Sequence, residues 1–152
     1  MRTLANILWH FPFFGFISAF FSFILGGILV ISVIGAPIGL GLIQHSKFLL
    51  SPFSSAMISD SKINKDKNFL WKSFGIIIQI LYFPFGLILA LITIIQIVLL
   101  FITIIGIPVA LVLSKSLSTY FNPVNKICVP VAVRDELEKE RAKETVERYL
   151  KK

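Results

Sequence analysis

The stretch TIIGIP, residues 103–108, ends a long apolar run, and a similar stretch, SVIGAP, occupies residues 32–37. Each stretch places a glycine two positions before a proline, Gly35 with Pro37 and Gly106 with Pro108. Proline lacks an N–H and clashes with the preceding helical turn, and glycine relaxes the backbone. The two motifs therefore predict a kink or an end in each of two apolar helices.

The apolar runs around these motifs predict helices embedded in a membrane. Hydrophobic residues make up 56% of the chain and charged residues 15%, against roughly 45–50% and 25% in ordinary soluble domains. Residues 3–46 and residues 73–114 contain no Asp, Glu, Lys or Arg. A bilayer core about 30 Å thick needs about 20 helical residues, so each run is long enough to cross roughly twice.

The positions of the basic residues predict how these runs are oriented. The formal net charge is +7, and every Lys and Arg lies outside the two runs. If each run crosses as a hairpin, all of these charges lie on one side, as the positive-inside bias requires. We therefore expect a multi-pass protein of the bacterial inner (cytoplasmic) membrane with both termini cytoplasmic.

The turn within each hairpin is easier to place in the first run than in the second. Gly26 and Gly27 are natural turn residues near the middle of the first run. The corresponding part of the second run offers only Thr93 and Gln96 as polar groups. A single long tilted helix therefore stays open as an alternative for the second run.

The two halves of the chain align with each other. A shift of 71 positions superposes the two glycine–proline motifs and places Pro52 on Pro123 without a gap. An even number of crossings between the copies predicts parallel repeats, a plan that recurs in membrane transport proteins. We divide the chain into membrane repeat 1 (1–53), a basic cytoplasmic loop (54–72), membrane repeat 2 (73–124), and a cytoplasmic extended segment with a charged helix (125–152).

A mixed polar and apolar segment follows each glycine–proline break. LGLIQHSKFLLSPF contains Lys47, and LVLSKSLSTYFNPV contains Lys115. Such segments fit amphipathic helices that lie at the membrane interface, with each lysine reaching toward lipid headgroups. The predicted fold class is an all-α integral membrane protein of two broken hairpins, each followed by an interfacial helix.

Several segments resemble one family. The opening MRTLANILW, the stretches GGILVISVIGAPIG and FITIIGIPVA, and the later Pro52 and Pro123 are similar to the YccF family of small bacterial inner-membrane proteins. The second copy departs from the family pattern, because Ala110 stands where a glycine is usual, and the first copy has Gln44 where a lysine is common. The resemblance implies an inner-membrane location and implies no reaction or ligand.

The sequence offers little for catalysis. All eight acidic residues lie outside the apolar runs, and His10, His45 and Cys128 are the only histidines and cysteine. Metal-ligand spacings and phosphate-binding loops are lacking, so we expect no catalytic residues, no metal, no cofactor and no enzyme activity. Basic and aromatic residues are not interleaved as in nucleic-acid-binding proteins, so the positive charge indicates attraction to anionic lipid.

The neutral polar residues of the second run carry the functional hypothesis. Gln79, Thr93, Gln96 and Thr103 are candidates to line a pore, and helix-to-helix hydrogen bonding is their alternative role. Four crossings enclose no useful conduit, so a pore requires several copies around an axis. The sequence favours a homo-oligomeric channel for small ions. The alternative is a structural or partner-binding membrane subunit without transport activity.

Overall fold

The computed structural model of the protein describes residues 2–11, 13–63 and 69–151. Most of these residues are helical, as the sequence predicts, and a two-stranded antiparallel sheet adds to them. In chain order the elements are α1 (Arg2–His10), α2 (Gly15–Ile31), α3 (Ala36–Leu50), β1 (Ser55–Ser59), η1 (Asp60–Lys62), α4 (Phe69–Ile102), η2 (Ile104–Gly106), α5 (Ile107–Phe121), β2 (Lys126–Pro130) and α6 (Val131–Leu150).

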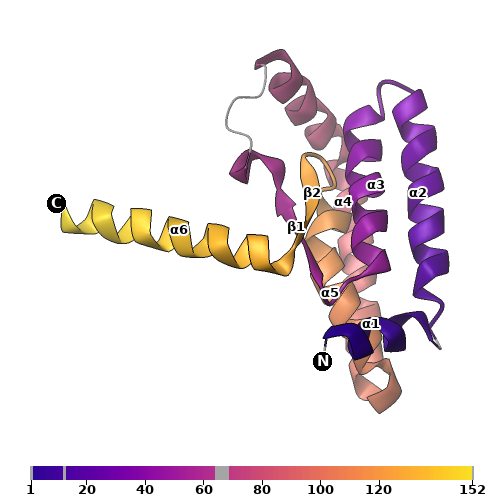
Figure 1. Ribbon diagram of the computed structural model, residues 1–152. Coiled ribbons are helices and arrows are strands. Elements are labelled where there is room, and N and C mark those ends of the chain that lie inside the picture. The colour runs from indigo at the N-terminus through magenta and orange to yellow at the C-terminus, as the bar shows by residue number, and fades with distance from the viewer. Residues whose placement is uncertain (1, 12, 64–68, 152) are drawn as a thin grey trace.

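Two helical hairpins form the body of the molecule (Figure 1). Helix α2 packs along α3, and α4 packs along α5. Within the described residues, the segments Ser73–Ile102 and Ile104–Phe121 are long and apolar enough to cross a membrane, and the bent pair α1–α2 adds a third if it forms one span. This helix content confirms an all-α membrane fold.

The first hairpin turns at its glycine–proline motif. The Ser32 hydroxyl donates to the Leu29 carbonyl at 2.7 Å and accepts from the Gly35 N–H at 3.1 Å, which holds the chain as it leaves α2. Val33 adopts a left-handed conformation with φ of 59°. Pro37 then lies in the first turn of α3, where a missing N–H costs no helical hydrogen bond.

The second hairpin turns in the same manner. The Thr103 hydroxyl donates to the Leu100 carbonyl at 3.0 Å. A Cβ on Gly106 would lie only 2.5 Å from that same carbonyl oxygen, so the turn excludes larger residues at this position. Pro108 lies in the first turn of α5. Each of these residues lies 71 positions after its counterpart in the first turn, the same shift that aligns the two halves.

The turn predicted at Gly26 and Gly27 is wrong, because α2 runs unbroken through both residues. Gly26 instead permits close packing of α2 on α3. A Cβ on Gly26 would lie 2.8 Å from the Gly39 carbonyl oxygen, and a Cβ on Gly39 would lie 2.5 Å from the Gly26 oxygen. The second run contains no central turn either, since α4 is one continuous helix around Pro84.

The two hairpins run in opposite directions. Strands β1 and β2, which follow α3 and α5, pair antiparallel from Ser55↔Pro130 to Ser59↔Lys126. Helices α3 and α5, the second helix of each hairpin and called return helices below, are also antiparallel. His45 on α3 lies beside Tyr120 late in α5, with ring centroids 5.1 Å apart. Beyond the end of α3, Pro52 accepts a hydrogen bond at 3.0 Å from Lys115, earlier in α5. The hairpin tips therefore lie at opposite ends of the molecule (Figure 1).

This arrangement differs from the predicted parallel repeats. The positions of the charged residues limit only the number of membrane crossings, whereas the antiparallel strand pairing fixes how the two hairpins face each other. The helices after the breaks also differ from separate interfacial helices. Both are return arms of hairpins, and α3 buries His45, Phe48 and Leu49.

The core lies where α1, α2, α3 and α5 meet. Its buried residues are Trp9, Ala19, Phe48, Leu49 and Val112. The Trp9 indole N–H donates to the Leu49 carbonyl at 2.8 Å, which ties α1 to the end of α3. Helix α6 leaves this body and projects as a single helix, packed only near its start against the sheet (Figure 1). Residues 64–68 of the predicted basic loop lie outside the described residues.

The glycine contact between α2 and α3 generates a test with a matched control. Gly26→Ala should lower the free energy of unfolding by about 1–3 kcal/mol, because the new methyl group overpacks the contact with Gly39. Gly27→Ala should raise it by up to about 1 kcal/mol, because no atom lies within 4 Å of a Cβ there and alanine favours the helix.

Denaturant unfolding of both variants in detergent measures the two changes. Equal responses of the two variants would contradict close packing at Gly26.

Candidate functional site

The four polar residues predicted to line a pore do not gather in one place. Gln79 and Gln96 are exposed on α4. Thr93 is 5% exposed and donates to the Leu89 carbonyl of its own helix at 2.7 Å. Thr103 belongs to the hairpin turn described above. Two of the four hydroxyls and amides are therefore used locally.

The two exposed glutamines do not form a polar stripe. They lie 17 positions apart, which places them about 100° from each other around a helix with 3.6 residues per turn. The surface between them is apolar, with Ile80 and Ile95 well exposed. A single chain therefore presents two separate polar points on α4 and no continuous path.

Of the two lysines predicted to meet lipid headgroups, Lys115 is bound within the protein. Its ammonium donates to the Pro52 carbonyl at 3.0 Å and lies 4.9 Å above the centre of the Phe53 ring. These contacts attach the middle of α5 to the segment between α3 and β1. They give Lys115 a structural role, and its predicted lipid contact stays a prediction.

Lys47 is placed differently. It lies in the last turn of α3 and is exposed. The described part of the chain shows no ion pair to its ammonium. It therefore presents a cation that the described protein does not neutralise.

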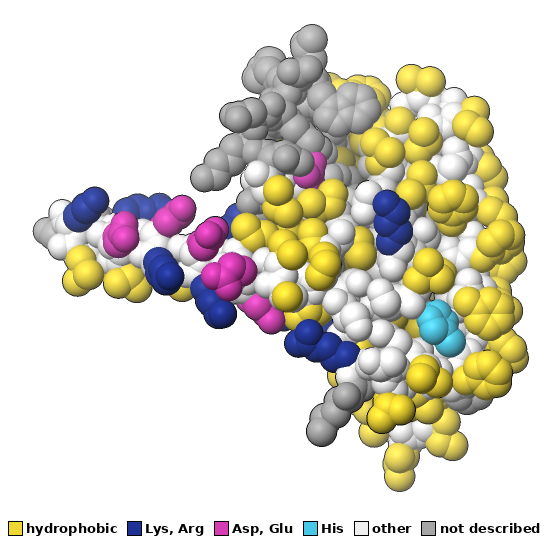
Figure 2. Space-filling view, in the orientation of Figure 1, with side chains coloured by type: hydrophobic (Ala, Val, Ile, Leu, Met, Phe, Trp, Pro, Cys, Tyr) yellow, Lys and Arg dark blue, Asp and Glu magenta, His cyan; other side chains and the backbone are white. Residues whose placement is uncertain are grey.

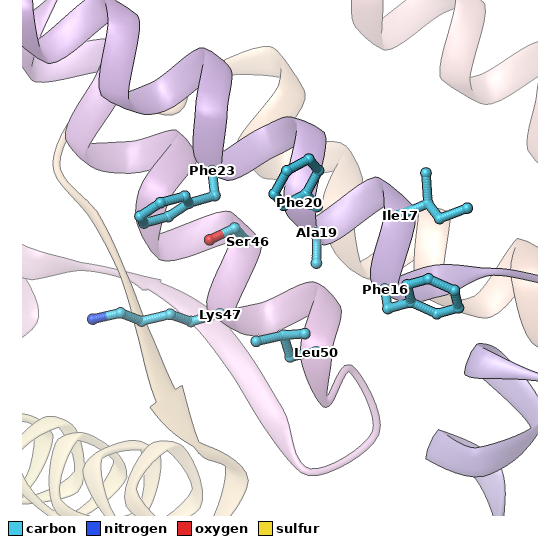
Figure 3. A pocket seen from close by; sticks show the side chains of 8 residues that line it. All are labelled: Phe16, Ile17, Ala19, Phe20, Phe23, Ser46, Lys47 and Leu50. Carbon is cyan, nitrogen blue, oxygen red and sulfur yellow. The ribbon is translucent and has the colours of Figure 1, made fainter.

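An apolar groove opens beside Lys47, between α2 and α3 (Figure 3). Its volume is about 550 Å³, and its lining residues are Phe16, Ile17, Ala19, Phe20, Phe23, Ser46, Lys47 and Leu50. Phe20 and Phe23 project from α2 and Leu50 from α3, whereas the Lys47 side chain extends away from α2 (Figure 3). The groove is thus an apolar channel with one cation at its edge.

The chemistry of this groove is binding, not catalysis. Ser46 is 4% exposed, and its hydroxyl donates to the Ile43 carbonyl at 2.8 Å, so it is engaged by its own helix. The other lining residues except Lys47 are apolar. A molecule with an alkyl portion and a negative group fits such a lining, since burial of apolar surface and charge attraction act on its two parts.

A second polar feature was not anticipated from the sequence. His45 on α3 and Thr119 on α5 are both 0% exposed. Within the described residues, the two ring nitrogens of His45 and the Thr119 hydroxyl have no hydrogen-bond partner. The His45 ring stacks on Phe48, with centroids 5.8 Å apart. The shift of 71 positions that aligns the two halves places His45 on Ser116, which is also buried. This alignment is the feature of the sequence that points to the buried polar pair.

A comparison with protein families bears on the part of the chain that contains the groove. Residues 4–55 match the model of the YccF inner membrane component domain. Over these residues the chain is similar to that domain. The matched residues cover the first hairpin with its glycine–proline turn, its groove and Lys47. The match confirms the family resemblance of this segment and supports a membrane location.

The YccF match ends at residue 55, so a second YccF-type copy in the later half of the chain stays a prediction. No curated protein and no solved structure matches the chain. Within the described residues, no group of His, Cys, Asp or Glu could hold a metal ion.

Cys128, whose pKa is affected by the charge of Lys47, provides a pH-dependent test. Burial raises the pKa of Cys128 in β2, while a hydrogen bond with Ser55 and the charge of Lys47 act in the opposite sense. Because the thiolate is the reactive form, alkylation of native Cys128 should be slow at neutral pH and should rise at a pH above that of an ordinary thiol.

A Cys128→Ser, Val133→Cys variant supplies an exposed reference thiol on α6. Maleimide rates measured across pH compare the two thiols. Coincident pH profiles would contradict the burial of Cys128.

Proposed function

We propose that the protein is a structural or partner-binding subunit of the inner membrane, whose two hairpins lie along one side of the bilayer. The sheet and α6 then stay in water on the cytoplasmic side, in agreement with the positive-inside bias. The observation that supports this placement is that Lys126 on β2 and Asp60, just after β1, line a cavity together with Pro37 at the start of α3.

Helix lengths argue against upright hairpins. Helix α3 contains 15 residues, or about 22 Å, which is shorter than a hydrocarbon core of about 30 Å. Helix α4 contains 34 residues, or about 51 Å, which is far longer than that core. Hairpins that lie in the membrane plane need no such match of length to thickness.

The positions of the charges argue in the same direction. Asp60 and Lys126 line a cavity of about 190 Å³ together with Pro37, at the start of α3. Lys47 and Lys115 lie near the other end of the same helix, where Lys115 contacts Pro52. An upright hairpin would carry one or both of these charged groups into the bilayer core, at a cost of several kcal/mol.

The surface of the molecule divides in the way that this placement requires. In Figure 2, hydrophobic side chains cover the edge formed by α2, and charged side chains gather over α6 on the opposite side. Residues such as Phe20, Phe21 and Ile28 on α2, and Ile80 and Leu81 on α4, are well exposed. Exposed apolar surface of this extent favours immersion in lipid.

The cytoplasmic side then offers α6 as the surface for a partner. This helix carries charges of both signs, with Arg134 paired to Asp135 at 2.7 Å and Lys139 to Glu136 at 3.5 Å. Near its start it contacts both strands, and the Val131 N–H donates to the Ser54 carbonyl at 3.0 Å. A membrane-held body with a projecting charged helix suits a subunit that attaches a soluble partner to the bilayer.

An ion pore is the second candidate, and the exposed Gln79 and Gln96 favour it. Amides on an apolar helix seek partners in hydrocarbon, and a neighbouring subunit or a water-filled axis would supply them. This function requires a homo-oligomer in which α4 stands across the membrane. The orientation of the hairpins therefore decides between the two candidates.

Cysteines at the hairpin tips test this orientation. In a Cys128→Ser background, Ile34→Cys and Ile104→Cys place thiols at the two tips, where the native residues are 67% and 85% exposed. Hairpins that lie within one side of the membrane keep both tips in lipid. An impermeant maleimide should therefore label neither tip from either side of sealed vesicles, whereas Lys143→Cys on α6 should label from one side.

Each alternative gives a different labelling pattern. Labelling of both tips from the side opposite Lys143→Cys would support upright parallel hairpins. Labelling of the two tips from opposite sides would support upright antiparallel hairpins. Either pattern would contradict the proposed placement and return attention to a pore.

A further inference from the structure

We infer that the groove between α2 and α3 binds an anionic phospholipid, with an acyl chain along the groove and the phosphate at Lys47. This inference concerns a ligand site within the residues that match the YccF domain, and it does not depend on how the hairpins are oriented. It uses the groove, the cation at its edge and the membrane location.

The shape and lining of the groove fit an acyl chain. A volume of about 550 Å³ falls in the range of about 300–1,000 Å³ that is typical of small-molecule sites. The residues along it are aromatic and aliphatic, contributed by α2 on one side and α3 on the other (Figure 3). An extended hydrocarbon chain needs such a lining and requires no hydrogen-bonding groups along its length.

The charge at the edge selects the headgroup. Among the described residues, Lys47 is the one charged residue that lines the groove, and no acidic side chain lines it. Its ammonium has no ion pair within the described residues. Lys115 makes a useful contrast, because the Pro52 carbonyl already accepts a hydrogen bond from it. A lipid phosphate with net negative charge would supply the partner that Lys47 lacks.

The surroundings of the groove favour a lipid over other occupants. Phe16, Phe20 and Phe23 line it and are also about half exposed, so its wall continues into the apolar outer surface of α2. Lipid chains reach such a groove directly from the bilayer. A free phosphate ion would satisfy Lys47 and leave the apolar channel unfilled, whereas a phospholipid satisfies both parts.

Two substitutions address the two parts of the proposed lipid separately. Lys47→Gln removes the charge, and Lys143→Gln removes the same charge from exposed α6 as a control. Ile17→Trp fills the groove. Ile24→Trp is its control, because both isoleucines are 41% exposed on α2 and only Ile17 lines the groove.

Native mass spectrometry of the full chain, extracted from vesicles of equal parts phosphatidylglycerol and phosphatidylcholine, counts the retained lipids. The wild type should retain phosphatidylglycerol in preference to phosphatidylcholine. Lys47→Gln should reduce that preference about fivefold, the equivalent of about 1 kcal/mol for one lysine near anionic lipid. Ile17→Trp should reduce retention of both lipids, and the two controls should behave as wild type.

Other outcomes would overturn the inference. Equal retention of the two lipids by the wild type would exclude selection of an anionic headgroup. Unchanged retention in Lys47→Gln and Ile17→Trp would place bound lipid elsewhere on the surface. An equal loss in Ile17→Trp and Ile24→Trp, while circular dichroism shows that both variants keep their helices, would mean that the groove is not the lipid site.

Discussion

The pairing of β1 with β2 is the constraint on which the rest of the structure depends. Met57 faces Cys128 at its centre, and the register extends two residues to each side. Because β1 directly follows one return helix and β2 the other, this short ladder fixes the two hairpins in opposite directions. It also places Lys126 and Asp60 beside the first half of α3, where both line a cavity with Pro37.

Part of this fold was open to prediction from the sequence. The two glycine–proline motifs correctly indicated two broken helices, and the charge-free runs correctly indicated a membrane protein. The motifs are hairpin turns, however, because Ser32 and Thr103 hold the preceding helix end while each proline starts the next helix. A glycine within an apolar run signals a turn and close packing equally well, so the role of Gly26 could not be settled from local sequence.

The direction of the hairpins and the groove lay beyond sequence reasoning for a physical reason. Both arise from long-range contacts, such as that of Lys115 with Pro52, 63 positions apart. The residues of β1 and β2 are few and mixed in character, and no alternating pattern marks them as strands. The sequence predicts a lipid-headgroup contact for Lys47 from its apolar neighbours, and this stays a prediction, whereas the wall of phenylalanines from α2 depends on the packing of α2 against α3.

A disulfide between the two strands tests this account most directly. Residues that face each other in an antiparallel pair have Cα atoms about 4.5–5.5 Å apart, within the range that a disulfide bridges. Met57→Cys should therefore form an intramolecular disulfide with native Cys128 under mild oxidation in the membrane. Gel electrophoresis would detect this disulfide as a mobility shift that a reductant reverses. Ile58→Cys, whose side chain points to the other face of the strand, should not. Cross-linking by Ile58→Cys in place of Met57→Cys, or by neither, would contradict the strand register and with it the antiparallel arrangement of the hairpins.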